Sequence, residues 1–378
     1  MRSEELTPVA IVGGGPVGMS LALALHKQGI AAKIFDARGR GAGLDDQRIL
    51  ALSYGTRQTL EWLGAWQGMD ATPIRTIHIS QRGHGGRSVI RAEQEHIPAL
   101  GYVVSLRELY RVLDAAVAAA NIVYHDNTRI EVVNAEVRHV NFLAGGETCR
   151  AQLVAYAEGI VDNTADINRH DYAQHAVTTI VSASEAPQGR AWERFTAQGP
   201  IALLPFGHAF ALVQSCSPEI AGALTTMPAT EFLAQLQDCF GQRLHFTGTG
   251  PRHSFPLGLR YRHEAVAERQ VWLGNAAQTL HPVAGQGFNL ALRDVRELAR
   301  TLTNAVDSGA PDLLHRYAKK RQLDRRCTIG FTDTLVRLFS NDNPLLGHAC
   351  GAGLLGLDLL PAARSFLARR MMFGARAW

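Results

Sequence analysis

The sequence is poor in cysteine, and its cysteines follow no pairing pattern. Five of the 378 residues are cysteine, an odd number, and no C-x-x-C pair occurs. This excludes a disulfide framework and a zinc ribbon, and it predicts a reduced, cytoplasmic protein. The fifteen histidines form no H-E-x-x-H motif and no ligand cluster, so we predict no metal site.

Long hydrophobic runs and strong charge are also absent. No stretch reaches the roughly 18 uncharged apolar residues of a membrane-spanning helix, and the polar first eight residues predict no signal peptide. The net charge of +4 is too mild to predict nucleic-acid binding, and the basic run KKRQLDRR (residues 319–326) is typical of a solvated helix face. Hydrophobic residues make up 46% of the chain, so it can bury a sizeable core.

A glycine-rich segment, GGGPVG, lies between an apolar strand-like run, PVAIV, and a helix-like run that ends at Gly29. In this G-x-G-x-x-G pattern, Gly13 permits a tight turn, Gly15 lets a diphosphate approach the backbone, and Gly18 lets helix and strand pack closely. The free N–H groups of the helix N-terminus favour an anion.

A second strand-like run, residues 31–35, ends at Asp36, eighteen residues after Gly18. A carboxylate at this point accepts hydrogen bonds from a ribose. Strand, glycine loop, helix, strand and acid together predict a dinucleotide-binding site. A glycine-rich turn without a ligand is the alternative, and the motif does not separate NAD from FAD.

Two arginines stand next to predicted helices. Arg48 precedes a helix-like stretch over residues 50–63. Ser105 and Glu108 form a capping-box pattern that opens a helix over residues 106–120. Arg107 lies in the first turn of that helix, where a cation opposes the helix dipole, so it predicts a nearby anion. A solvent-facing arginine is the alternative.

The middle of the chain changes to strand-like patterns, as in HAVTTIVSAS (residues 175–184) and HAFALVQSC (residues 208–216). RGHGGR (residues 82–87) predicts a hairpin turn, and one amphipathic helix covers residues 230–240. We therefore predict an α/β protein in which a sheet-rich domain is inserted into a Rossmann-like domain. The nucleotide-binding part comprises residues 1–75, 100–165 and 260–330, the inserted part residues 76–99 and 166–259, and a helical tail residues 331–378.

Another glycine-containing loop stands before a helix late in the chain, in GNAAQTLHPVAGQGFNLALRD (residues 274–294). A buried strand-like run precedes it, and a helix over residues 288–305 is expected after it. This repeats the strand, loop and helix order of the N-terminus, so a second helix N-terminus faces a ligand or, alternatively, the segment is only a structural turn.

These segments resemble the flavoprotein aromatic hydroxylases of the para-hydroxybenzoate hydroxylase type. The likeness is closest to the ubiquinone-biosynthesis hydroxylases of the UbiH branch, which act on 2-polyprenyl-6-methoxyphenol. It is carried by GGGPVG, Asp36 and residues 274–294, and also by DDQRILALSYGTRQTLEWLGAW, RGHGG, ERFTAQGPIALLPF and IGFTDTLVRLF. The resemblance runs from about residue 9 to at least residue 339.

The resemblance implies an FAD-dependent monooxygenase that uses NAD(P)H and O2 and works through a C4a-hydroperoxyflavin. It implies hydroxylation of a polyprenyl phenol, with the ring 4-position carried over from that branch. The candidate catalytic residues are His281, Pro282 and Gln286, with His281 either shaping the substrate face or transferring a proton. The implied cofactor-binding residues are Gly13, Gly15, Gly18, Asp36, Arg48, Arg107, Glu158, Gly159, Asn275, Gly285, Gly287, Phe288 and Asn289.

The sequence departs from the family pattern at one point, and the role of its C-terminal tail has two interpretations. Glu158-Gly159 stands where relatives usually have Asp-Gly, and the serine that usually follows is missing, which puts flavin retention and NAD(P)H coupling in question. The basic, apolar tail predicts either a helix packed on the FAD domain or a contact with a membrane surface or with a partner in a biosynthetic complex. The alternatives to the ubiquinone hydroxylase are a same-fold hydroxylase of a soluble phenol and a non-catalytic subunit.

Overall fold

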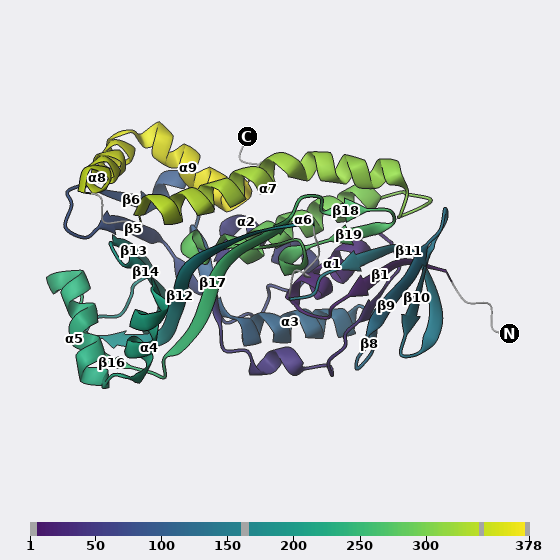
Figure 1. Ribbon diagram of the computed structural model, residues 1–378, viewed down its shortest axis with the longest axis horizontal. Coiled ribbons are helices and arrows are strands. Elements are labelled where there is room, and N and C mark those ends of the chain that lie inside the picture. The colour runs from purple at the N-terminus through teal and green to yellow at the C-terminus, as the bar shows by residue number, and fades with distance from the viewer. Residues whose placement is uncertain (1–5, 160–165, 340–343, 375–378) are drawn as a thin grey trace.

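The computed structural model describes residues 6–159, 166–339 and 344–374. One sheet lies at each end of the elongated molecule, and the C-terminal helices run along one side of both (Figure 1).

The N-terminal sheet has the layout expected for a nucleotide-binding fold. Its strands follow the order β18-β19-β11-β1-β2-β8, and the pairs from β19 to β8 are all parallel. Helix α1 packs against both α3 and α6, and the apolar residues of the three helices share one core with β1 and β11. The bounds are β1 Thr7–Val12, α1 Pro16–Lys27, β2 Ala32–Phe35, α3 Leu106–Ala119, β8 Val123–His125, β9 Ile130–Ala135, β10 Val140–Ala144, β11 Glu147–Tyr156, β18 Val266–Ala267, β19 Gln270–Trp272 and α6 Gln286–Leu302.

A small antiparallel sheet, β3-β7-β4, lies between the two ends of the molecule. It brings the segment after Arg48 beside the start of α3, because Ile49 pairs with Ser105. Its elements are η1 Ala42–Asp45, β3 Ile49–Ser53, α2 Tyr54–Leu63, β4 Thr72–Ile74 and β7 Gly101–Ser105.

The second sheet has nine strands in the order β20-β17-β12-β15-β14-β13-β5-β6, with β16 paired to β12. Helices α4 and α5 cover one of its faces, and the apolar residues between them form a separate core. Its elements are β5 Thr76–Gln81, β6 Arg87–Arg91, η2 Ala92–Glu95, β12 Ile167–Ala183, β13 Arg190–Thr196, β14 Gly199–Phe206, β15 Ala209–Cys216, α4 Pro218–Thr226, α5 Ala229–Phe240, η3 Gly241–Arg243, β16 Phe246–Thr249, β17 His253–Arg262 and β20 Gln278–Thr279.

Three helices end the chain: α7 Pro311–Phe339, α8 Pro344–Leu359 and α9 Pro361–Phe373. Helix α8 packs on β5 and β6, whereas α9 packs on α2. Within the described part of the chain, no single helix is long and apolar enough to cross a bilayer. Residues 347–359 and 361–373 pass that test only as a pair, which is bent by 99°.

The structure confirms most of the predicted elements and corrects some. The hairpin around residues 82–87 is confirmed, since β5 and β6 pair antiparallel on either side of it. The helix expected from residue 50 is wrong at its start: residues 49–53 form β3, and Ser53 caps α2 by accepting a hydrogen bond from Thr56 N. Helix α4 was not predicted, and the expected boundary at residue 330 falls inside the continuous helix α7.

Candidate active site

The first glycine loop has the geometry that its motif requires. Gly13 has a φ of +104°, and a Cβ there would lie 2.9 Å from Ala157 O. At Gly18 a Cβ would lie 1.9 Å from Gly13 O, so helix α1 packs too closely on the loop for any side chain. At Gly15, by contrast, a Cβ would meet nothing within 4 Å, so the backbone faces open space there. This open approach to the N-terminus of α1 is what a diphosphate needs.

Asp36 follows β2 and lies against this loop. Its carboxylate is buried and accepts hydrogen bonds from the backbone amides of Gly14 at 2.9 Å and Arg38 at 2.8 Å. Arg38 also forms an ion pair with it at 3.4 Å. A carboxylate has about four acceptor positions, and the two short backbone bonds fix its orientation. Ribose hydroxyls would replace the two long hydrogen bonds that the Arg38 side chain donates, at 3.4 and 3.5 Å.

Two further segments meet the glycine loop. Asn275 is exposed and donates a hydrogen bond to Gly159 O at 3.4 Å. Its neighbour Gly274 has a φ of +58°, and a Cβ there would lie 3.0 Å from Val17 in α1. Glu158 is exposed at the end of β11, and its backbone nitrogen lies 3.1 Å from where a Gly13 Cβ would be. Residues 160–165, where the missing family serine was noted, lie outside the described residues.

The two predicted arginines come together as well. Leu106 N donates to Arg48 O at 2.8 Å, so Arg48 and Arg107 flank the same junction of β3 and α3. Both side chains are exposed. Arg48 forms an ion pair with Asp46 at 2.6 Å, and although burial opposes it, the hydrogen bonds and charge of Arg48 lower the pKa of Asp46.

The expected capping box at this junction is only half formed. Ser105 Oγ accepts from Glu108 N at 3.1 Å, as predicted. The Glu108 carboxylate does not return to the cap, because it accepts hydrogen bonds from Asp70 N and Arg111 instead.

Helix α6 begins at the second glycine loop. Gly285 has a φ of +59°, and a Cβ there would lie 3.2 Å from the Cβ of Ala51 in β3. A Cβ at Gly287 would meet nothing within 4 Å. The amides of Gly287 and Phe288 are in the first turn, where no intrahelical acceptor is available to them. The start of α6 therefore offers N–H groups and the positive end of the helix dipole to accessible space.

Asn289, predicted to bind the cofactor, has its side chain fully used within the protein. Its Oδ1 accepts from Ser53 N and Thr56 Oγ1, and its Nδ2 donates to Ala51 O and Gly285 O. The side chain is buried, so we assign it the positioning of the Gly285 loop rather than a polar contact with a ligand.

The three candidate catalytic residues lie around this loop in different environments. Pro282 is exposed, whereas Gln286 is buried and donates to Met371 O at 3.5 Å. His281 is 1% exposed, and burial lowers its pKa to about 4, so it is neutral at pH 7. Its Nδ1 accepts from Val283 N at 3.1 Å, so the proton is on Nε2, for which the described residues offer no hydrogen-bond partner.

Tyr172, which the sequence did not single out, packs edge-on against His281 with a centroid distance of 5.4 Å. Its hydroxyl donates to Asp333 in α7 at 2.9 Å. Burial, followed by the hydrogen bond and charge of Asp333, raises the Tyr172 pKa. No sequence motif marks this pair, because residues 172 and 333 meet only through the packing of β12 on α7.

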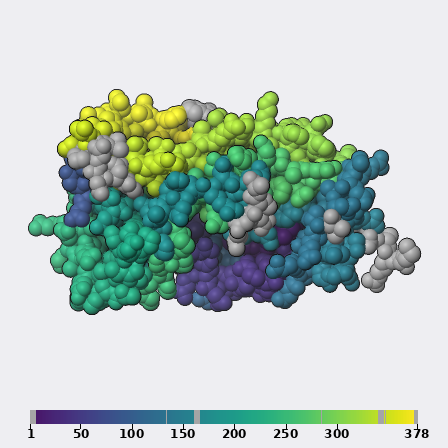
Figure 2. Space-filling model, viewed as in Figure 1, coloured from purple at the N-terminus to yellow at the C-terminus, as the bar shows by residue number. Residues whose placement is uncertain are grey.

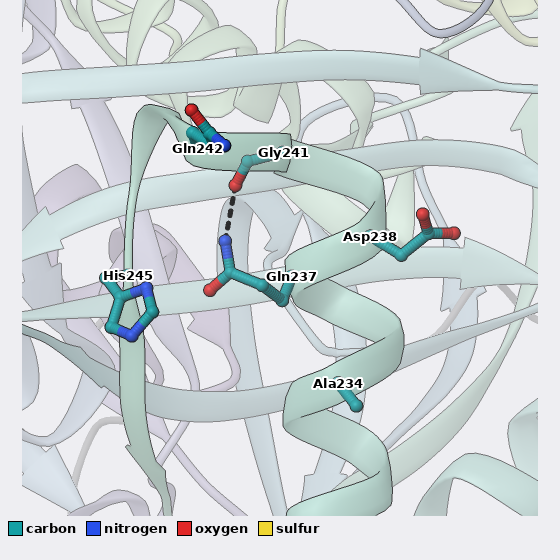
Figure 3. Close-up of a pocket in the computed structure, with 6 residues that line it drawn as sticks. All are labelled: Ala234, Gln237, Asp238, Gly241, Gln242 and His245. Atoms are coloured by element: carbon teal, nitrogen blue, oxygen red, sulfur yellow. Dashed lines mark hydrogen bonds between the residues drawn. The ribbon is translucent and has the colours of Figure 1, made fainter.

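Two surface pockets lie away from these residues. One, of about 430 Å³, is lined by Ala234, Gln237, Asp238, Gly241, Gln242 and His245 beside α5 (Figure 3). Gln237 crosses it to bond Gly241 O and Leu244 O and accepts from Phe246 N, so it stabilises the turn. The other, of about 680 Å³, adjoins the turn at residues 83–87. Neither is lined by a predicted site residue, and the described residues hold no metal-ligand cluster.

The residues present fit FAD. Open space over Gly15 fits a diphosphate, Asp36 fits a ribose, and open space over Gly287 at a helix N-terminus fits the polar edge of a flavin ring. In Figure 2, atoms of the purple N-terminal segment are visible in a hollow between the two ends of the molecule.

Comparison with known proteins gives the same assignment. The FAD binding domain family matches residues 6–328. Ubiquinone hydroxylase UbiL of Rhodospirillum rubrum is 32% identical over 98% of this chain and 90% of its own. The 3-demethoxyubiquinol 3-hydroxylase of Escherichia coli is 32% identical over 94% of this chain and 96% of its own.

Solved structures share the fold at lower identity. The p-nitrophenol 4-monooxygenase PnpA of Pseudomonas putida superposes with a TM-score of 0.78 at 17% identity, covering 99% of this chain and all of its own. PqsL of Pseudomonas aeruginosa, in complex with 2-aminobenzoylacetate, gives 0.75 at 21% identity, covering 93% of this chain and all of its own. The chain therefore belongs to the FAD binding domain family, as a relative of the ubiquinone-biosynthesis hydroxylases and with the fold of the flavin monooxygenases.

Proposed function

We propose that this chain is an FAD-dependent monooxygenase that hydroxylates a polyprenylated methoxyphenol in ubiquinone biosynthesis, with NAD(P)H as the electron donor. One structural observation supports it most: an open glycine backbone at the N-terminus of α6, held by Asn289, adjoins the largely apolar second sheet. Bound FAD would supply the activated oxygen, which is chemistry that the protein side chains lack.

The residues of the protein would bind the cofactor and orient it. Gly13, Gly15 and Gly18 would admit the diphosphate, and Asp36 would hold the adenosine ribose. Asn275, Glu158 and Gly159 would meet the chain between the ring and the diphosphate. These three converge on the glycine loop, since Asn275 bonds Gly159 O.

At the ring, the amides of Gly287 and Phe288 would stabilise negative charge that develops on reduced flavin. Neutral His281, with Nε2–H as a donor, would orient a group in the space beside Pro282 rather than act as a base, because its pKa of about 4 makes it a weak one. Arg48 and Arg107, both exposed at one junction, would meet the cofactor from the β3 side.

A membrane surface is the partner that the tail favours. Several apolar side chains are exposed around the bend between α8 and α9, namely Leu355, Leu359, Leu360 and Phe366. Leu345 is exposed at the other end of α8. A polyprenyl substrate resides in a bilayer, so a peripheral position at the inner membrane would give the site access to it. Replacing both Leu359 and Leu360 with glutamine should weaken co-sedimentation with vesicles and leave the flavin bound.

The first test is the visible spectrum of the purified protein after gel filtration with added FAD. Bound flavin, NAD(P)H oxidation that depends on a prenylated methoxyphenol, and one 18O atom from 18O2 in the product would support the proposal. Nuclear magnetic resonance of that product would test the ring 4-position. Turnover only with soluble phenolic acids would support the same-fold alternative, and a colourless protein would support a non-catalytic subunit.

A further inference from the structure

A carboxyl group, that of Glu193, lies on the face of the second sheet that is turned toward the glycine loop at residues 283–287, called the flavin loop below. Glu193 is in the middle of β13, and side chains alternate between the two faces of a strand. Its neighbour Trp192 points to the face covered by α5, where it packs edge-on against Phe240. Ala191, Glu193 and Phe195 therefore share the opposite face.

The two residues that flank Glu193 locate this face relative to the site. Ala191 belongs to an apolar cluster that includes Ala51 of β3, the residue that a Cβ at Gly285 would touch. Phe195 belongs to a cluster that includes Val283, two residues before Gly285. Glu193 thus lies between Ala191, which packs with Ala51 on one side of the flavin loop, and Phe195, which packs with Val283 on the other.

The surroundings of Glu193 on this face are apolar. It pairs across the sheet with Ile79 of β5 and Ala202 of β14, and the adjoining positions of β14 on this face are Pro200 and Leu204. No described residue gives the Glu193 carboxyl a hydrogen bond or an ion pair. The side chain is only partly buried, so it reaches accessible space rather than a sealed core.

A carboxyl without a partner in apolar surroundings costs stability, and a fold gains nothing structural from it. Burial raises the pKa of Glu193 to about 7, so the group changes protonation near neutrality. Other titratable side chains beside this face are Tyr172 and His281, which pack against each other, and Asp333 of α7. Tyr172 and Asp333 are bonded to each other, and His281 is neutral.

Resting on the function proposed above, we infer that Glu193 is a catalytic residue that binds the phenol hydroxyl of the substrate and accepts its proton while the ring is hydroxylated. A phenol directs an electrophilic oxygen onto its ring much more strongly when its own oxygen releases a proton. A carboxyl on this largely apolar face, opposite the flavin loop, is suited to that exchange.

One proton passes from the phenol to Glu193 and later returns. The phenol O–H bond breaks, an O–H bond to the Glu193 carboxylate forms, and the freed electron pair moves into the ring. The ring carbon then bonds to a hydroxyl oxygen from the two-electron oxidant that bound FAD and O2 would supply. The O–O bond of that oxidant breaks, its other oxygen leaves with the electron pair and takes up a proton from water, and the ring becomes a hydroxylated dienone. Loss of the ring C–H proton to water restores aromaticity, and Glu193 returns its proton to the phenol oxygen.

Two variants separate binding from proton transfer. Glu193→Leu removes both functions without a cost in folding, because it removes a carboxyl that has no partner. Glu193→Gln keeps a hydrogen-bond acceptor but cannot take a proton. The exposed carboxylate Glu185 belongs to the same sheet domain, so Glu185→Gln is the matched control.

The FAD-loaded proteins would be titrated with 2-methoxy-6-geranylphenol and with its methyl ether, following the change in flavin absorption. We expect Glu193→Leu to weaken phenol binding at least about tenfold and to leave methyl-ether binding unchanged. We expect Glu193→Gln to keep phenol affinity within about threefold and to slow a single turnover about a hundredfold or more.

Equal loss of affinity for both probes in Glu193→Leu, or unchanged turnover in Glu193→Gln, would overturn the inference and leave the proposed function standing. Wild-type protein that binds FAD but neither binds nor hydroxylates the phenol would overturn both.

Discussion

The side-chain oxygen of Asn289 accepts a hydrogen bond from the backbone amide of Ser53 at 2.8 Å. This bond ties the first turn of α6 to the cap of α2, although the two residues are 236 positions apart in the chain. Through its amide group the same side chain holds Ala51 O and Gly285 O. The loop that carries the flavin-facing glycines is thus fixed to β3 by one asparagine.

Replacing Asn289 with leucine should therefore damage both the fold and the site. The amide of Ser53 and the hydroxyl of Thr56 would lose their buried acceptor, at a cost of about 3 kcal/mol in the free energy of unfolding. Chemical denaturation would measure this, and FAD titration should show a weaker complex. Asn134→Leu, on an exposed strand, is the control; equal FAD affinity in both variants would contradict the positioning role.

The glycines of the first loop should separate cofactor binding from folding. Gly15→Val adds a side chain in open space, so the protein should fold but purify colourless. Gly18→Val would drive a Cβ to within 1.9 Å of Gly13 O, so it should lower the melting temperature as well. Gly222→Val, at another open glycine in α4, should keep both flavin and fold. A yellow Gly15→Val protein would show that the diphosphate does not lie there.

Helix α9 should be needed for tight FAD binding. Met372 O accepts a hydrogen bond from Ser53 Oγ at 3.0 Å, and Met371 O accepts one from Gln286. Arg370 also approaches buried Asp324 at 3.6 Å. A chain ending at Leu360 should therefore bind FAD several-fold more weakly, as measured by fluorescence titration, whereas Phe366→Gln, which alters only an exposed side chain, should not.

The N-terminal loop and the C-terminal tail differ in how far the sequence predicts their structure. The strand, glycine loop and helix of the N-terminus were predictable because each rests on local chemistry: a turn at Gly13, close packing at Gly18 and a charge after β2. The packing of α9 on Ser53 was not, since no local pattern couples residue 372 to residue 53.

The same distinction explains the errors. Residues 50–53 fit a helical pattern, but pairing with β7 makes them a strand and leaves Ser53 as the cap. Glu108 fits a capping box, but Arg111 and the amide of Asp70 compete for its carboxylate. Glu193 is the first residue of ERFTAQGPIALLPF, one of the segments that carry the family resemblance, but that segment does not mark its carboxyl as a site. Only the register of β13 with β5 and β14 places Glu193 on the face turned toward the flavin loop.

The last prediction concerns acid stability. Burial lowers the folded-state pKa of His281 to about 4, below its unfolded value of 6.5, so the unfolded chain binds more protons between these two values. The stability that neutral His281 allows is fully present above pH 6.5 and is lost as the pH falls toward 4.

Between pH 7 and pH 5 this one group should lower the free energy of unfolding by about 2 kcal/mol. His281→Gln keeps an acceptor for Val283 N but has no titrating group, so its unfolding free energy should fall less over that interval. The unfolding free energy of the variant should still fall somewhat between pH 7 and pH 5. The reason is His78, whose pKa is also lowered to about 4, by burial and then by neighbouring arginines. Urea denaturation at pH 7 and pH 5 would measure the change in unfolding free energy for each protein. An equal change in the wild type and in His281→Gln would mean that His281 is not buried in its neutral form.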